Sequence, residues 1–427
     1  MQFSSKLSNI LNNAAWMSIE QVLRLFGSLL IGIWIARHLG PTEFGSYSFA
    51  IAFSSLIGIF SNLGLNRTLV RELSLNLSDK AFTQRIIATS ISWRILISVA
   101  CYVFAATLSI FFEQGRPLLI AIIALNIVFN SSEVFDIYFQ SRTASRYAVI
   151  ARSISFFVFL LIKILLLLNE GDIVDFAIVM SLESFGTALS LYLANKYFGI
   201  KLHFSDIDFR YGGRLIVKCW PELLAGFACL IFMRIDQIML GNIIGDAAVG
   251  QYSIASRLAE SWYFIPTALV ASTFPALVIK RTSDKTLYLK RIQQLMLVLV
   301  LISYLVAFIV TLIAPWGIPF LFGPDYKNSS SILIVLIWSG LFVSLGTASG
   351  SWIVAEGKLM LSLTRNLIGA ISNILFNLYL IPRYGALGAA YGTLISISIA
   401  YFFSDFLNKQ TRQIGFLKLK SILLIWK

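Results

Sequence analysis

Apolar runs fill almost the whole chain and decide what it can fold into. A membrane-spanning helix needs about 20 largely apolar residues. Twelve runs of about that length, each ended by charged residues, glycine or proline, occupy residues 14–36, 44–65, 86–112, 118–139, 153–169, 173–195, 219–240, 251–278, 294–314, 330–354, 359–381 and 386–407. Only 13% of the 427 residues are charged, against roughly 25% in soluble domains, which excludes a soluble globular protein. We therefore predict an all-α integral membrane protein with twelve transmembrane helices.

Basic residues accumulate on one side of the predicted spans. Of the 34 Lys and Arg residues, 25 fall in segments on that side, among them Arg152, Arg365 and Lys418. Because Lys and Arg collect in short cytoplasmic loops, both termini are predicted to be cytoplasmic. The cations that give the net charge of +13 are spread over seven segments, whereas a nucleic-acid binder gathers them on one face. Nucleic acid is therefore not an expected partner.

The chain lacks the residues that most metal sites and nucleotide sites need. Its three cysteines, Cys101, Cys219 and Cys229, have no CxxC spacing, and it has only two histidines. This argues against a disulfide framework and against a metal cluster. A GxxxxGK[ST] loop for nucleotide phosphates is also missing from the sequence. We predict no metal, no cofactor and no ATP-driven pumping by this chain.

Residues 39–50 match residues 244–255 without a gap and are identical at five positions, an offset of 205 residues. Six predicted spans separate the two copies, and an even number preserves orientation, so we expect parallel repeats around a central cavity. The alternative is that both segments simply share a glycine-containing turn. The repeat predicts a six-helix bundle in residues 1–200, a cytoplasmic linker in 201–218, a second six-helix bundle in 219–407 and a basic cytoplasmic tail in 408–427. Such halves suit alternating access.

Ionisable residues inside the predicted spans are candidates for function, because each costs at least ~2.5 kcal/mol to insert. Five cations could give the cavity a positive charge that suits an anionic substrate: Arg24, Arg94, Lys163, Arg234 and Arg257. Arginine is well matched to phosphate, since its planar fork donates two parallel hydrogen bonds. Three acids are candidates for ion coupling or charge compensation: Glu20, Asp236 and Glu260.

Each of these charges also has a structural interpretation. Glu20 and Arg24, like Arg257 and Glu260, have the spacing of an intrahelical ion pair that only offsets the cost of insertion. Arg94 lies near a predicted cytoplasmic end and can snorkel to the surface. Arg234 and Asp236 are two residues apart, so they point to different faces and need separate partners.

One amino-terminal pattern is shared with a known family. It consists of Trp34-Ile35-Ala36-Arg37-His38-Leu39-Gly40-Pro41-Thr42-Glu43-Phe44-Gly45, then Asn62-Leu63-Gly64-Leu65 and Leu69-Val70-Arg71-Glu72. The pattern resembles the signature of polysaccharide-biosynthesis flippases, the Wzx-type O-antigen transporters of the multidrug/oligosaccharidyl-lipid/polysaccharide superfamily. This resemblance implies transfer of an undecaprenyl-diphosphate-linked oligosaccharide from the cytoplasmic to the periplasmic leaflet of a bacterial inner membrane. It implies membrane lipid, a coupling ion such as H⁺ or Na⁺, and polysaccharide polymerase or export proteins as partners.

Two other functions compete with this prediction. A cation-coupled multidrug exporter would have the same pattern of spans, but its substrates are usually cationic, which five cavity cations oppose. A polysaccharide-pathway membrane enzyme would need a large outer loop with an acid–base pair, and every predicted outer connection is short. The sequence therefore predicts a transporter and not an enzyme.

Overall fold

The computed structural model describes residues 2–76, 79–111, 116–198, 206–283 and 285–425, which form helices joined by short turns and contain no strand. Nine helices in these ranges are long and apolar enough to cross a membrane. The predicted all-α membrane class is therefore confirmed. The chain divides into two units: unit 1 comprises Met1–Leu39 and Ala50–Phe227, and unit 2 comprises Gly40–Phe49 and Ala228–Lys427.

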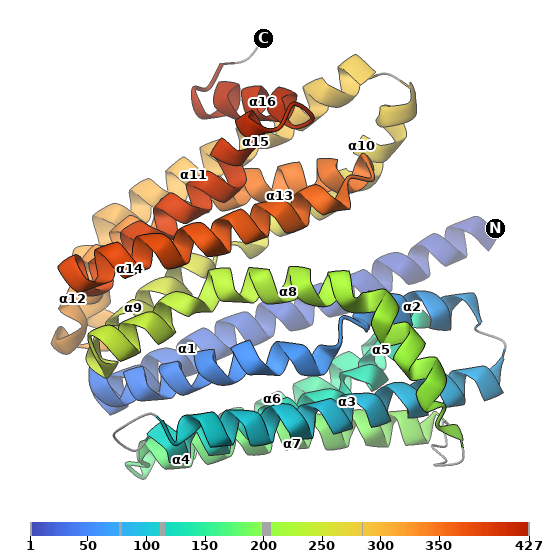
Figure 1. The fold of residues 1–427 in the computed structure, drawn as a ribbon, viewed down its shortest axis with the longest axis horizontal. Helices are drawn as coiled ribbons and strands as arrows, with labels where there is room; N and C mark the ends of the chain where they lie inside the picture. The colour runs from blue at the N-terminus through green and yellow to red at the C-terminus, as the bar shows by residue number, and fades with distance from the viewer. Residues whose placement is uncertain (1, 77–78, 112–115, 199–205, 284, 426–427) are drawn as a thin grey trace. The chain divides into compact units, whose positions relative to one another are not determined.

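Unit 1 is a helical bundle in which α3 packs against α4, and α7 packs against both α4 and α6 (Figure 1). Asp172 starts α7 with a capping box, since its side chain accepts from the backbone N–H of Asp175 and the Asp175 side chain accepts in return. The helices of this unit are most of α1 (Gln2–Gly58), η1 (Ile59–Asn62), α2 (Asn66–Leu75), α3 (Lys80–Ser109), α4 (Arg116–Phe129), η2 (Asn130–Ser132), α5 (Glu133–Ser141), α6 (Arg146–Leu168), α7 (Ile173–Tyr197) and the first part of α8 (Phe209–Ile243).

Unit 2 is built in a similar way, with α12 in contact with α9, α11 and α14. A five-residue π-helical turn, η5, interrupts the helical chain shortly before its last two helices. The helices are the second part of α8, then α9 (Asp246–Glu260), α10 (Phe264–Ser283), α11 (Lys285–Phe322), η4 (Pro324–Tyr326), α12 (Lys327–Ile337), α13 (Ser339–Ala355), α14 (Leu359–Ser398), η5 (Ile399–Phe403), α15 (Ser404–Leu407) and α16 (Arg412–Ile422).

Two of the helices, α1 and α14, each contain a sharp bend at a glycine. Gly40 in α1 has φ 72° and ψ 174°, and Gly385 in α14 has φ 58° and ψ −135°. Glycine adopts such positive φ values at no steric cost. The chain reverses direction at both bends (Figure 1), so α1 and α14 each cover two of the predicted spans. The predicted span 251–278 is divided between α9 and α10, which are not among the nine apolar helices.

The two copies of the sequence repeat contact each other within unit 2. A Cβ atom on Gly45 would lie 1.8 Å from the carbonyl oxygen of Asp246, and one on Gly250 would lie 2.0 Å from that of Pro41. The 205-residue offset relates Gly45 to Gly250 and Pro41 to Asp246. The contact is therefore reciprocal, as a local two-fold relation between duplicated segments requires. Only glycine fits at either position.

The segment predicted as a basic tail contains helix α16, which packs against α11 and α15. Lys418 on this helix is completely buried, and its Nζ lies 2.7 Å from Oδ2 of Asp405. Asp405 also forms an ion pair with Arg365, whose side chain is 6% exposed. Both cations, which the sequence places in segments on the basic side of the spans, are therefore buried and share one carboxylate partner. Removal from water lowers the pKa of Lys418 to about 8.

The lowered pKa of Lys418 predicts a specific pH dependence of stability. A lysine in the unfolded chain keeps a pKa of about 10.4, so between pH values of about 8 and 10 the unfolded chain binds more protons. The free energy of unfolding should therefore rise with pH across this window. Lys418→Met should lose that rise, whereas Lys420→Met, on the exposed face of the same helix, should keep it. Unfolding of the purified protein in detergent, followed at several pH values, measures both; the same slope in Lys418→Met and wild type would contradict the prediction.

Candidate functional site

A network of charged side chains joins three helices of unit 1. Arg152 on α6 donates from Nε to Oε1 of Glu20 at 2.8 Å and from Nη2 to Oε2 at 2.6 Å. Its Nη1 also forms an ion pair with Asp136 on α5. Glu20 is only 5% exposed, so this two-pronged contact supplies the hydrogen bonds that a buried carboxylate needs. Arg152 is not among the predicted site residues, because it precedes the predicted span 153–169 and falls in a segment on the basic side of the spans.

Arg24 contacts the same network more weakly. Its Nη1 lies 3.6 Å from Oε1 of Glu20, and its guanidinium lies 5.7 Å from the ring centre of Phe156. The side chain is 42% exposed. The expected intrahelical pair of Glu20 and Arg24 therefore exists, but Arg152 is the nearer partner of Glu20. Arg24 lies within the predicted span 14–36. A half-exposed arginine in a membrane span is expected to face a hydrated path, because contact with lipid would be costly.

A second polar contact joins α1 to the start of α6, two helical turns before Glu20 and Arg152. The Asn13 side chain accepts a hydrogen bond from the backbone N–H of Ser145 at 2.7 Å and donates one to its Oγ at 3.2 Å. Asn13 precedes Glu20 by seven residues, as Ser145 precedes Arg152, so both pairs repeat after two helical turns. The face of α1 that carries Asn13 and Glu20 therefore packs on α6 and the residue before it.

The two other predicted cations of unit 1 are compensated. Arg94 is completely buried, lies 3.2 Å from Oε2 of Glu133 and donates to Asn66 and to the backbone oxygen of Asn62. It does not snorkel, because these partners hold it inside the bundle. Lys163 on α6 pairs with Glu183 on α7, and both side chains are mostly buried.

In unit 2, the charges on α8 and α9 pair differently from the expected pattern. Glu260 lies 3.3 Å from Nη2 of Arg234, and in the described part of the chain Arg257 has no carboxylate within 4 Å. Arg257 instead lies over the ring of Phe44, 5.2 Å from its centre. The intrahelical pair of Arg257 and Glu260 is therefore not formed, and among the described residues Arg257 has no ion-pair partner.

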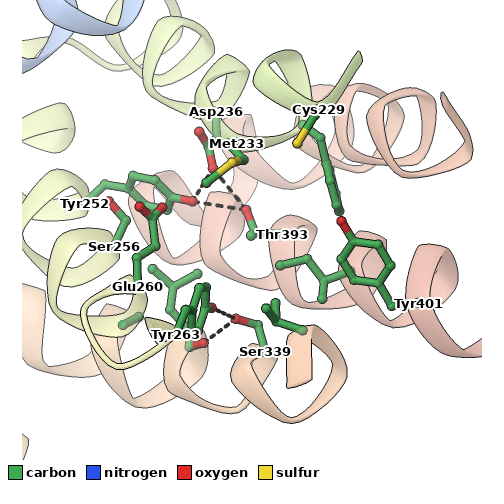
Figure 2. A pocket seen from close by; sticks show the side chains of 15 residues that line it. Cys229, Met233, Asp236, Tyr252, Ser256, Glu260, Tyr263, Ser339, Thr393 and Tyr401 are labelled. Atoms are coloured by element: carbon green, nitrogen blue, oxygen red, sulfur yellow. Dashed lines mark hydrogen bonds between the residues drawn. The ribbon is translucent and has the colours of Figure 1, made fainter. Parts of the chain in front are cut away.

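Asp236 is buried in a group of uncharged polar side chains. Figure 2 shows its carboxylate facing the hydroxyls of Tyr252 and Thr393. Tyr252 donates to Oδ2, Thr393 donates to the same atom at 3.1 Å, and the backbone N–H of Gln237 donates to Oδ1 at 2.9 Å. Asp236 is 2% exposed and has no cation within 4 Å among the described residues. As the two-residue spacing predicted, Arg234 and Asp236 have separate partners.

Two asparagines of α14 extend this group. Asn373 Nδ2 lies 3.5 Å from Thr393 Oγ1, and Asn377 donates to Asn373 Oδ1 at 3.0 Å. Both are completely buried, and Asn377 Oδ1 has no hydrogen-bond partner within the part of the chain that the structure describes. These residues were not among the predicted site residues, although two asparagines four residues apart in an apolar span were a visible signal.

Asp236 and Glu260 share a pocket of about 120 Å³ that is lined mainly by apolar side chains. Tyr263 and Ser339, which are hydrogen-bonded at 3.0 Å, line its opposite wall, and Tyr401 from the π-helical turn lines one end (Figure 2). The structure thus brings together two of the three predicted coupling residues, while Glu20 belongs to unit 1. Within the described residues, no cluster of three His, Cys, Asp or Glu side chains could hold a metal.

Lys163 and Glu183 form a mostly buried ion pair. We therefore expect the loss of one charge to destabilise the protein more than the loss of both. Lys163→Met or Glu183→Gln alone leaves one buried charge without its partner, which typically costs about 3–5 kcal/mol, whereas removing both is often nearly neutral. Each single variant should lower the thermal unfolding midpoint in detergent, and the double variant should recover most of the loss. Additive losses in the double variant would contradict a compensating pair.

Two family profiles and several named proteins are similar to this chain. The profile of a family described as "Polysaccharide biosynthesis protein" matches residues 10–278, and the MatE profile matches residues 221–379. The capsular polysaccharide biosynthesis protein CapF of Staphylococcus aureus is 23% identical over 404 residues, 92% of this chain and 99% of that protein. A putative O-antigen transporter of Shigella flexneri is 25% identical over 407 residues, 90% of this chain and 93% of that protein.

Two solved structures share the fold. The lipid II flippase MurJ in an inward closed conformation has a TM-score of 0.71 at 16% identity, covering 97% of this chain and 91% of that one. An inward-facing multidrug resistance MATE family transporter has a TM-score of 0.70 at 16% identity, covering 96% and 99%. At such identities the likeness concerns the fold alone.

Proposed function

Because its residues 10–278 match the family profile, this chain belongs to the polysaccharide biosynthesis protein family, and we propose that it is a lipid-linked oligosaccharide flippase. Its substrate is an undecaprenyl-diphosphate-linked repeat unit, moved from the cytoplasmic to the periplasmic leaflet of a bacterial inner membrane by alternating access. Twelve membrane crossings with both termini in the cytoplasm complete the proposal. The observation that carries it is the end-to-end similarity to proteins named for O-antigen transport and capsular polysaccharide biosynthesis.

Among the predicted cations, Arg24 and Arg257 are the ones we assign to the diphosphate. Arg24 is half-exposed with one long contact to a carboxylate, and Arg257 has none within 4 Å in the described residues. Arg234 is 28% exposed and can exchange Glu260 for an anion. Arg94 and Lys163 already have close carboxylate partners, so we assign them to packing. The planar guanidinium group of arginine can donate two parallel hydrogen bonds to phosphate oxygens, which supports the assignment of Arg24 and Arg257 to the diphosphate.

Outward movement of an anionic group is favoured by an inside-negative membrane potential, by about 2.3 kcal/mol per charge per 100 mV. The empty site must then return to its inward-facing state, and the same potential favours this return because it carries positive charge inward. We propose that a cation, H⁺ or Na⁺, binds at Asp236 during this step. A buried carboxylate that is hydrogen-bonded to tyrosine and threonine hydroxyls and has no cation within 4 Å among the described residues offers oxygen ligands or a proton site.

The flippase proposal predicts where lipid-linked oligosaccharide accumulates. In cells depleted of this protein, a probe restricted to the outer face should detect little of it, and the intact protein should restore the signal. Arg24→Ala and Arg257→Ala should each lower the signal about tenfold or more, the loss expected from a charge-assisted contact. The exposed Arg383→Ala is the matched control and should behave as wild type. A normal leaflet distribution after depletion, without a redundant flippase, would refute the proposal.

The coupling role of Asp236 predicts a separate effect. In vesicles containing the purified protein, an imposed Na⁺ or pH gradient should accelerate lipid transfer by the wild type. Asp236→Asn removes the charge while retaining the shape of the side chain, so transfer should no longer respond to the gradient. Asp325→Asn, an exposed acid of the same unit, should keep the response. An undiminished response in Asp236→Asn would exclude this residue as the coupling site.

A cation-coupled multidrug exporter is the second candidate. The MatE match over residues 221–379 and the mainly apolar pocket with Asp236 and Glu260 favour it. The cationic side chains of Arg24 and Arg257 oppose it, because they would repel cationic drugs. Efflux of cationic dyes from cells that show a normal leaflet distribution would select this function over the flippase.

A further inference from the structure

The charge network of unit 1 divides its contacts unequally between two arginines. Arg152 binds both oxygens of Glu20, at 2.8 and 2.6 Å, and also binds Asp136. Arg24 reaches Glu20 with one nitrogen at 3.6 Å. Arg152 is 18% exposed and Arg24 is 42% exposed. One arginine therefore supplies the hydrogen bonds of the buried carboxylate, and the other lies at its open side.

Because Arg152 holds Glu20 more tightly than Arg24 does, the contact between Arg24 and Glu20 is the one that can break. A bidentate arginine–carboxylate pair is strong and directional, whereas a partly exposed pair at 3.6 Å adds little. If Arg24 turns away, Glu20 keeps both hydrogen bonds to Arg152 and no buried oxygen loses its partner. Glu20 therefore does not need Arg24, but it does need Arg152.

Close packing of α1 against α6 fixes the position of the Arg24 backbone. A Cβ atom on Gly27 would lie 2.7 Å from the ring of Phe156, so α1 and α6 approach closely two turns beyond Glu20 on α1 and one turn beyond Arg152 on α6. The guanidinium of Arg24 lies over the same ring. With Asn13 bonded to Ser145 on the other side, α1 is held along this face while the end of the Arg24 side chain stays accessible.

We propose that Arg152 is a positioning residue for the diphosphate: by satisfying Glu20 and Asp136, it leaves Arg24 free to exchange its contact with Glu20 for a phosphate oxygen. This inference rests on the flippase function proposed above. Without Arg152, Glu20 is a buried carboxylate whose one remaining cation in this network is Arg24. Arg24 is then drawn into the pair and withdrawn from the substrate, although Arg24 itself is unchanged.

The test measures binding of farnesyl diphosphate, a short polyprenyl diphosphate, to the full-length purified protein in detergent. Arg152→Gln should weaken binding about tenfold or more, the loss expected when one charge-assisted contact disappears. The double variant Glu20→Gln with Arg152→Gln removes the carboxylate that captures Arg24 and should restore binding to near the wild-type level. Asp136→Asn with Arg152→Gln changes the net charge equally but leaves Glu20 in place, so it should remain weak.

The two double variants distinguish positioning of Arg24 from an effect of net charge and from an effect of packing. Equal rescue by both would mean that only net charge matters, and rescue by neither would mean that Arg152 acts through packing; either result overturns the proposal. If variants lacking Arg152 do not fold, Glu20→Gln alone decides: Arg24 gives up only a weak contact there, so binding should stay at or above the wild-type level. Binding that falls about tenfold or more in Glu20→Gln would also overturn it. Wild-type protein that fails to bind, or binding that Arg24→Ala leaves intact, would count against the flippase site itself.

Discussion

Inside a bilayer, a charged side chain is stable only if the protein supplies its partner, and this requirement organises the described helices. The pair Arg152 with Glu20 joins α1 to α6, and Lys163 with Glu183 joins α6 to α7. Asp405, bound to both an arginine of α14 and a lysine of α16, holds the last helix against unit 2. Ion pairs of this kind add little net stability over apolar packing, but a wrong helix arrangement would leave charges buried alone.

A few charged groups depart from this pattern, and the proposed function depends on them. Arg24 has a long, exposed contact, Arg257 lies over an aromatic ring, and Asp236 is surrounded by hydroxyl and amide groups. Holding such groups without a close counter-charge costs free energy that pairing would remove. A ligand or ion that completes the site during transport can offset that cost. The physical distinction between structural and functional charges is therefore how completely the protein itself satisfies them.

The sequence predicted much of the architecture because apolar length and glycine conformation are local properties. Each predicted span overlaps a helix, and the repeat around Gly45 and Gly250 reappears as a reciprocal backbone contact. The sequence places Arg152 and Lys418 in segments on the basic side of the spans and does not reveal their carboxylate partners. Both lie near the ends of apolar runs, where a sequence cannot distinguish a side chain in water from one that turns into the bundle.

By itself, the sequence determined the membrane class, the positions of the apolar helices, the internal repeat and the candidate charges. Only the tertiary structure decided which charges neutralise one another. Glu20 and Arg152 are separated by 132 residues, and Asp236 and Thr393 by 157. Local spacing instead suggested Arg257 as the partner of Glu260, a contact that the fold replaces with Arg234. Partner choice depends on which helix faces come together, and that is a property of packing between distant segments, which local periodicity does not encode.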